Sequence, residues 1–246
     1  MEREVWEENY RQLSAEITEW GEVQAGFPER VLADLRREME QRKGGDLMLF
    51  YDTEVVGRPV KGSLYFERES AGGPFRWAHF EVDLGKDSGA MVRENSFVRG
   101  SGYAVNLREA VNLMEGRSIY REPAFDPARQ GYWVSLSVNG PFAGMHLLEY
   151  DRNDFVVEPA IRESPLAWWL DRAAQEKLAG ELREGGRVRV EVGPTSRKRV
   201  IFVEVDALEQ RLRFTDGRQR EIELPGPSPT PTREHHSLGQ HAGRKR

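Results

Sequence analysis

Two pairs of carboxylates, Glu81 with Asp83 and Glu204 with Asp206, have the spacing that most directly permits acid–base or metal chemistry in this chain. One residue separates the members of each pair. On a strand both side chains therefore point to the same face, where a general acid and base or a divalent metal site could form. The same spacing is typical of any strand with one face in water, and we favour that interpretation for both pairs.

Other catalytic patterns are missing from the sequence. There is no cysteine, which excludes disulfides, thiolate ligands and cysteine nucleophiles. The five histidines show no metal-ligand spacing, no Gly-x-Ser-x-Gly motif is present, and Gly100-Ser101-Gly102 lacks the lysine and third glycine of phosphate-binding loops. We therefore predict a protein that is not an enzyme and that has no cofactor, no metal and no small-molecule substrate.

The strongest binding signal is a set of basic residues in a predicted β-meander near the end of the chain. Arg187 and Arg189 flank Val188, while Arg211 and Arg213 flank Leu212, so each pair shares the polar face of its strand. The candidate nucleic-acid-binding residues are Arg187, Arg189, Arg197, Lys198, Arg199, Arg211 and Arg213. The alternative is a solvated face neutralised by cross-strand acids, and the number of nearby acids favours it. These acids are Glu191, Glu204, Asp206, Glu221 and Glu223.

Composition limits the partners of the chain. The formal net charge is -5, so contact with nucleic acid needs a local basic face. No apolar run approaches the roughly 20 residues of a membrane span, and the charged N-terminus lacks the apolar core of a signal peptide. With 38% hydrophobic residues in 246, the chain can build one large or two small cores. We predict a cytoplasmic protein with no membrane contact.

The clearest structural element is a short helix over residues 106–115. Asn106 and Glu109 have the spacing of a capping box at its start, and Gly116 can adopt the left-handed conformation that ends a helix. Apolar residues fall on one face of this helix, at Leu107, Ala110, Val111 and Met114. A strand is expected to follow directly.

The remaining elements follow from periodicity and turn residues. Two helices are expected within residues 1–44, the first with Trp6, Tyr10, Leu13, Ile17 and Trp20 on one face. In the predicted strand 75–84, Phe75 and Trp77 are expected to share a face with His79, Glu81 and Asp83. A helix is expected over 171–184, with irregular structure over 151–164. The last strands are expected at 187–192, 199–206, 211–215 and 219–224.

A weak internal repeat indicates the architecture. Three times the sequence reads as a helix end, a glycine and then a strand with a hairpin, around Gly44-Gly45, Gly116 and Gly185-Gly186. We predict an α+β fold of antiparallel hairpins with helices on one face, built from three such modules. The expected regions are an N-terminal helical pair (1–44), a central helix–hairpin region (45–150), a helix plus meander (151–225) and a Pro-rich basic tail (226–246).

The segment Leu107-x-Glu109-Ala110-x-Asn112-Leu113-x-x-Gly116-Arg117-x-Ile119 resembles the signature of an uncharacterised bacterial family encoded on conjugative elements and plasmids. Trp133-Val-Ser-Leu136 is similar to a strand of that family. The resemblance implies an accessory protein of a mobile element, with nucleic acid or a DNA-processing protein as partner, and it carries over no catalytic residue. Two alternatives stay open: a protein-binding module, with Trp168-Trp169 as an exposed patch, and a metal-dependent enzyme using the carboxylate pairs.

Overall fold

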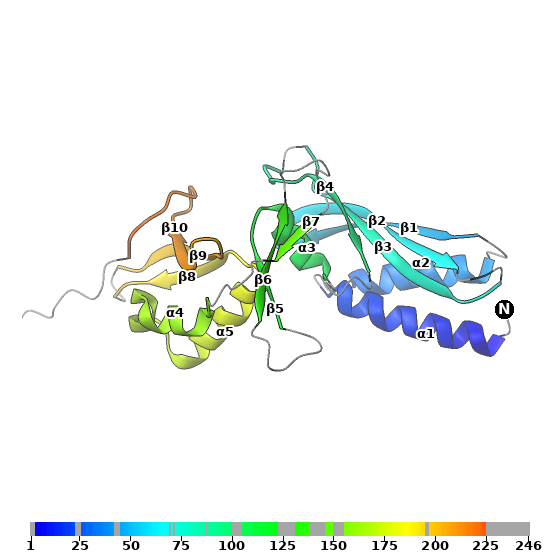
Figure 1. The fold of residues 1–246 in the computed structure, drawn as a ribbon, viewed down its shortest axis with the longest axis horizontal. Helices are drawn as coiled ribbons and strands as arrows, with labels where there is room; N and C mark the ends of the chain where they lie inside the picture. Colours follow the sequence, from blue (N-terminus) through cyan, green and yellow to red (C-terminus); the bar gives the residue numbers. More distant parts are fainter. Residues whose placement is uncertain are drawn as a thin grey trace, which may run out of the picture.

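The computed structural model describes residues 3–22, 26–41, 45–68, 70, 72–86, 88–99, 105–122, 131–137, 146–149, 155–194 and 197–224. These residues form five α-helices, one 3-10 helix and ten strands in three antiparallel sheets, which confirms the α+β class (Figure 1). The chain extends lengthwise from the N-terminal helices to the last sheet. No described helix is both long and apolar enough to cross a membrane.

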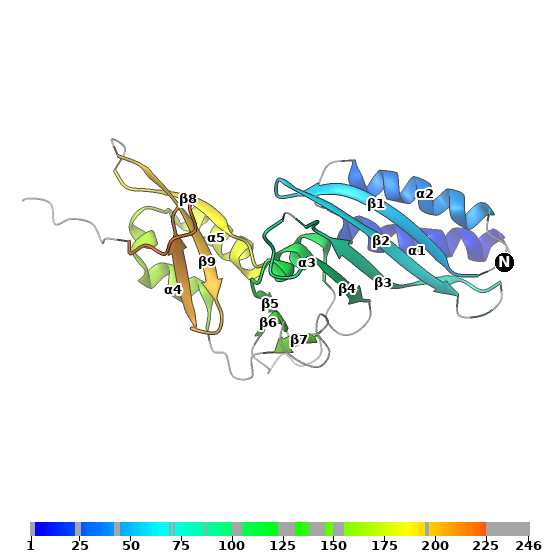
Figure 2. The same cartoon turned by 90° about the horizontal axis from the view of Figure 1, so that it is seen from above.

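The first layer is a four-stranded sheet with two helices on one of its faces (Figure 2). Its elements are α1 (Arg3–Trp20), α2 (Phe27–Gln41), β1 (Leu47–Val55), β2 (Arg58–Arg68), β3 (Phe75–Asp83) and β4 (Glu94–Val98). Buried and exposed residues alternate along β1, because one face of the sheet packs on a core and the other faces water. Trp20 lies in this core, where its ring contacts the rings of Phe27, Tyr51, Trp77 and Phe80.

One prediction for β3 is wrong. Phe75 and Trp77 do not share a face with His79 but are buried in the core. The register between β2 and β3 shifts by one residue at Ala78, which forms a β-bulge. Because strand side chains alternate, one extra residue moves the preceding side chains to the opposite face.

A small second sheet lies between two hydrophobic cores. It runs in the order β5 (Ile119–Arg121), β6 (Tyr132–Ser137) and β7 (His146–Glu149). Val134 belongs to the first core, together with α1–α3 and the large sheet, whereas the adjacent Trp133 belongs to the second core. Consecutive strand residues point to opposite faces, so this sheet joins the two cores.

The second core lies beneath the third sheet, whose strand order is β10-β9-β8. Its elements are α4 (Val157–Glu163), η1 (Pro165–Trp168), α5 (Arg172–Arg183), β8 (Val188–Val192), β9 (Arg199–Asp206) and β10 (Arg211–Thr215). Helices α4 and α5 contact these strands from one face. The bounds predicted for β9 and β10 are confirmed.

Two predictions in this region are wrong. Helix α4 forms where irregular structure was expected; it has seven residues and no side-chain cap at Val156, and burial of Val157 and Ile161 stabilises it instead. The strand expected at 219–224 is reduced to one bridge, Thr215 with Glu221, because Gln219 has a φ of 61° and turns the chain.

Helix α3 (Leu107–Met114) begins and ends as predicted. The Asn106 side chain accepts from the backbone N–H of Glu109 at 2.9 Å, and the Glu109 carboxylate accepts from the backbone N–H of Asn106 at 3.0 Å, which completes a capping box. Gly116 has a φ of 84°, and its N–H donates to the carbonyl of Leu113. The expected apolar face is buried.

The glycine stops of the repeat share one geometry. Gly45, Gly116 and Gly185 all have φ near 80°, and each lies between a helix and a sheet. Helices α3 and α5 both end in a Schellman motif: the N–H of Arg117 donates to the carbonyl of Asn112, and that of Gly186 to Glu181. The two helix ends are therefore equivalent in backbone structure.

Gly62→Ala is expected to lower the free energy of unfolding by about 2 kcal/mol or more, because overpacking forces the backbone to move. A Cβ atom at Gly62 would lie 1.9 Å from the carbonyl oxygen of Glu81 and 2.5 Å from the Tyr51 hydroxyl. The matched control is Gly180→Ala, within α5, where a Cβ would meet nothing within 4 Å. The control should gain about 0.5–1 kcal/mol. Urea unfolding followed by circular dichroism measures both, and an unchanged midpoint for Gly62→Ala would contradict the packing described.

Candidate nucleic-acid interface

The third sheet places four of the predicted basic residues, Arg187, Arg189, Arg211 and Arg213, on one open face. Arg199 pairs with Val192 on the opposite face, and Arg197 and Lys198 precede β9 in the β8–β9 hairpin. In its register Arg189 pairs with Phe202, Arg213 with Glu204, and Arg211 with Asp206. Paired residues share a face, so these arginines point away from the second core. The opposite face carries Val190, Val192, Ile201, Val203 and Leu212, which are buried against α4 and α5.

Several expected acids do pair with these cations. The Glu204 carboxylate lies 2.9 Å from Arg187 Nε and 2.6 Å from an Arg213 guanidinium nitrogen, and its side chain is only 9% exposed. Glu191 lies within 3.4 Å of both Arg189 and Lys198. The arrangement is therefore partly the solvated, neutralised face that the sequence allowed.

Of the remaining expected acids, only Glu221 forms an ion pair within the described ranges. Glu221 pairs with Arg211 at 2.6 Å, and this hydrogen bond raises the pKa of Arg211. Asp206 accepts from the backbone N–H of Glu209, and neither it nor Glu223 forms an ion pair within the described ranges. The Lys198 ammonium, with Arg189 beside it, lowers the pKa of Glu191, so this carboxylate stays ionised at mildly acidic pH.

Neutralisation of the open face is incomplete. Glu204 and Glu191 are each shared by two cations, which leaves one surplus positive charge in each group, whereas Asp206, opposite Arg211, adds one negative charge to the same face. Arg197 and Arg199 are exposed and form no ion pair with any residue that the structure describes. Residues 187–246 carry 13 Arg and Lys against 8 Asp and Glu, although the chain as a whole is acidic.

Apolar groups lie among these cations. The Arg187 guanidinium stacks over the Phe202 ring, with its Cζ atom 4.3 Å from the ring centroid, and it also donates to the Thr215 hydroxyl at 3.3 Å. Val200 is exposed on the same face as Phe202. The face thus combines guanidinium groups with exposed apolar surface, a mixture suited to a phosphate-bearing polymer with flat bases.

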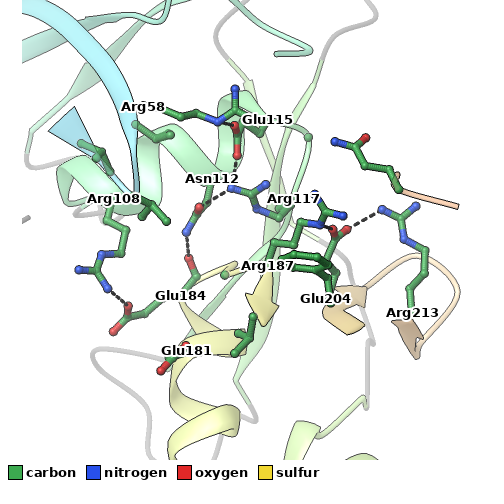
Figure 3. Close-up of a pocket in the computed structure, with 18 of the residues that line it drawn as sticks. Arg58, Arg108, Asn112, Glu115, Arg117, Glu181, Glu184, Arg187, Glu204 and Arg213 are labelled. Carbon is green, nitrogen blue, oxygen red and sulfur yellow. Dashed lines mark hydrogen bonds and ion pairs between the residues drawn. The ribbon is translucent and has the colours of Figure 1, made fainter. Parts of the chain in front are cut away.

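A cleft of about 400 Å³ lies where this face meets the first layer (Figure 3). Arg187, Glu204 and Arg213 form one wall, and the β1–β2 hairpin and α3 form the other. In the other wall, Glu115 pairs with both Arg58 and Arg117. Two Arg–Glu–Arg groups, each with one surplus positive charge, therefore line the same cleft.

The sequence did not predict the second group. Arg58 lies in a hairpin distant in the chain, and no spacing rule connects it to the meander. The repeat gives no signal for Arg117 either, because Gly116 corresponds to Gly185 and Arg117 therefore corresponds to Gly186 rather than to Arg187.

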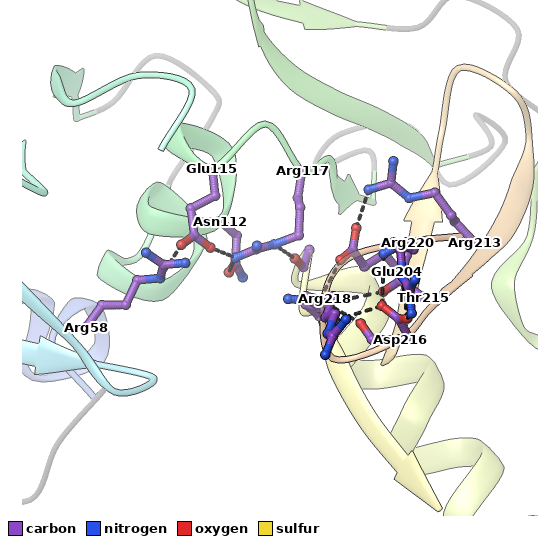
Figure 4. A network of polar contacts seen from close by, with 12 residues as sticks. Arg58, Asn112, Glu115, Arg117, Glu204, Arg213, Thr215, Asp216, Arg218 and Arg220 are labelled. Carbon is purple, nitrogen blue, oxygen red and sulfur yellow. Dashed lines mark hydrogen bonds and ion pairs between the residues drawn. The ribbon is translucent and has the colours of Figure 1, made fainter. Parts of the chain in front are cut away.

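Part-buried polar contacts join the end of α3 to the end of α5 beside this cleft (Figure 4). The Asn112 amide donates to the carbonyl of Glu184 at 2.7 Å and accepts from Arg117 at 2.5 Å. Arg117 Nε donates to the carbonyl of Gly185 at 2.7 Å. An amide from α3 and a cation from the segment just after it thus satisfy the carbonyls at the C-terminal end of α5, where the helix dipole favours positive charge.

The carboxylate pairs are not brought together with other metal ligands. Glu81 accepts from the Tyr65 hydroxyl at 2.8 Å and Asp83 accepts from the backbone N–H of Gly85 at 2.6 Å, whereas Glu204 is held by arginines. Among the described residues, no group of three or more His, Asp or Glu side chains is placed to hold a metal ion.

The two tryptophans expected to form an exposed patch lie in different environments. Trp168 is 66% exposed, whereas Trp169 packs against the second core. Gly100-Ser101-Gly102 and the basic tail lie outside the described residues.

Comparison with known proteins gives no further guide to this site. Searches of protein-family models, of curated proteins and of solved structures each found no match to this chain.

Asn112→Ala is expected to lower the free energy of unfolding by about 2 kcal/mol, because it removes a buried amide and leaves a part-buried carbonyl and a guanidinium N–H without that partner. It should also accelerate amide hydrogen exchange at the end of α5. The control is Arg108→Ala, which removes a half-exposed pair with Glu184 at 3.8 Å and should cost less than about 0.5 kcal/mol. Equal effects of the two variants would contradict the role given to Asn112.

Proposed function

We propose that this chain is a non-enzymatic binding protein of a mobile genetic element, acting in the cytoplasm, which contacts nucleic acid through the open face of β8–β10. The observation that carries the proposal is the placement of Arg187, Arg189, Arg211 and Arg213 on one face, where a single carboxylate, Glu204, is shared by two of the four guanidiniums. The similarity of Leu107–Ile119 to the mobile-element signature supports the biological setting.

The chemistry of this face favours phosphate contacts over base reading. Guanidinium groups bind phosphate oxygens through paired hydrogen bonds, and each such contact releases counterions. The exposed cations Arg197, Lys198 and Arg199 lie together at the β8–β9 hairpin, beside the open sheet face. We therefore expect binding that depends strongly on salt and weakly on nucleotide sequence.

Binding of fluorescein-labelled DNA and RNA, measured by anisotropy at two salt concentrations, tests this proposal. The variant replaces Arg189, Arg197, Arg199 and Arg211 by Ser; all four are exposed, so buried Glu204 keeps its partners. Affinity should fall at least about 100-fold at low salt, with a smaller salt slope, since each lost phosphate contact removes about 0.9 from the slope on duplex DNA.

The matched control replaces the same number of exposed arginines elsewhere, at Arg11, Arg30, Arg37 and Arg172. It changes net charge equally and should bind almost as well as the unmodified chain. A chain ending before Pro225 separates the folded face from the basic tail. Equal losses in the two arginine variants, or loss only on truncation, would contradict the proposed surface.

Glu204→Gln is expected to increase nucleic-acid affinity about fivefold, because it releases the charge of two guanidiniums onto the face, and to steepen the salt slope by about 1. The same change should lower the free energy of unfolding by about 2 kcal/mol, since a largely buried ion pair loses one partner. Anisotropy and urea unfolding measure the two effects. Weaker binding by the folded variant would show that Glu204 is not opposing the ligand.

A protein-binding module remains the second candidate, and the exposure of Trp168 favours it. Complete absence of nucleic-acid binding by the unmodified chain at low salt would make this the better interpretation.

A further inference from the structure

The four-stranded sheet has a second face that neither α1 nor α2 covers (Figure 2). Its side chains follow from the register, in which residues paired across β1–β4 point to the same face. The first row across the sheet consists of Met48, Tyr65, His79 and Val98. This face lies in the first layer, apart from the basic face of β8–β10.

Apolar and aromatic groups occupy one end of this uncovered face. Phe50 is 71% exposed, and Met48 and Val98 are also exposed. The Tyr65 and His79 rings stack with their centroids 4.2 Å apart and their planes 13° apart, which presents a flat surface beside Phe50. An exposed row of this kind across a whole sheet is a feature of contact surfaces rather than of scattered surface residues.

Acidic residues occupy the other end. Asp52, Lys61, Asp83 and Glu94 form a cross-strand row, with Glu81 in the adjacent row. The single lysine is paired with Asp52 at 3.4 Å, which leaves the other carboxylates in excess. Phe50, Glu81, Asp83 and Glu94 line a shallow hollow of about 840 Å³.

We propose that this face docks a basic segment of a partner protein, in which Lys or Arg side chains alternate with aliphatic ones. The aliphatic groups would cover Phe50 and the Tyr65–His79 stack, while the cations would lie in the acidic hollow. Excess carboxylates repel phosphates, so the face is unsuited to nucleic acid. The inference rests on a surface separate from the one proposed to bind nucleic acid, and together the two would make the chain an adaptor.

The test uses the full chain and a labelled twelve-residue peptide of alternating Lys and Leu as the probe, with anisotropy as the readout. Two control peptides separate the contributions: alternating Glu and Leu inverts the charge, and alternating Lys and Ser removes the apolar groups. Only the Lys–Leu peptide should bind well, and salt should weaken its binding. Binding of the Lys–Ser peptide with equal affinity would overturn the proposal, because charge alone would then explain it.

Variants locate the surface. Phe50→Ser should reduce affinity for the Lys–Leu peptide about tenfold, as removal of a central aromatic contact does. Leu208→Ser should not reduce it, because Leu208 is equally exposed at 71% but lies in the turn between β9 and β10. Asp83→Asn with Glu94→Gln should reduce the affinity about fivefold and flatten its salt dependence. Unchanged affinity in either the Phe50 variant or the carboxylate variant would overturn the proposal. Sedimentation showing that the chain self-associates and that Phe50→Ser abolishes this association would also overturn it, because a second copy would then be the occupant.

Discussion

The hydrogen bonds between the end of α3 and the end of α5 determine how the rest of the structure fits together. Asn112 and Arg117 donate hydrogen bonds to the carbonyl groups of Glu184 and Gly185 at the end of α5, where carbonyl groups have no partner within the helix. Gly185 is required at this point, since its φ is 78° and a Cβ atom would lie 2.8 Å from the carbonyl oxygen of Ser118. The two cores are therefore held by a polar contact as well as by the shared small sheet.

This contact has a consequence for charge. It brings the Arg187–Glu204–Arg213 group to the same cleft as the Arg58–Glu115–Arg117 group. Sharing one carboxylate between two guanidiniums satisfies the buried acid and retains positive charge at the surface. The basic character of the third sheet thus survives within an acidic chain, while the uncovered face of the first sheet retains the acids.

The sequence predicted local structure well where side chains mark the ends of elements. Asn106, Glu109 and Gly116 define α3, and strict alternation defines β9 and β10. Prediction failed where tertiary packing decides. The bulge at Ala78 depends on pairing with β2, and α4 is stabilised by burial without a cap.

For the candidate site, the sequence placed the arginines on one strand face but left their partners undecided. Only the register shows that Glu204 lies opposite Arg213, because cross-strand neighbours depend on turn geometry. The second arginine group at the cleft depends on the packing of α3 against α5. No property of the sequence near the meander encodes that contact.

The most direct test of the account is to follow the side-chain Nε–Hε resonances of arginine during titration with a DNA oligonucleotide. Shifts are expected for Arg187, Arg189, Arg211 and Arg213, with Arg11 and Arg172 unchanged. Shifts confined to arginines outside β8–β10, or to those of the tail, would contradict the claim that the open face of this sheet contacts nucleic acid.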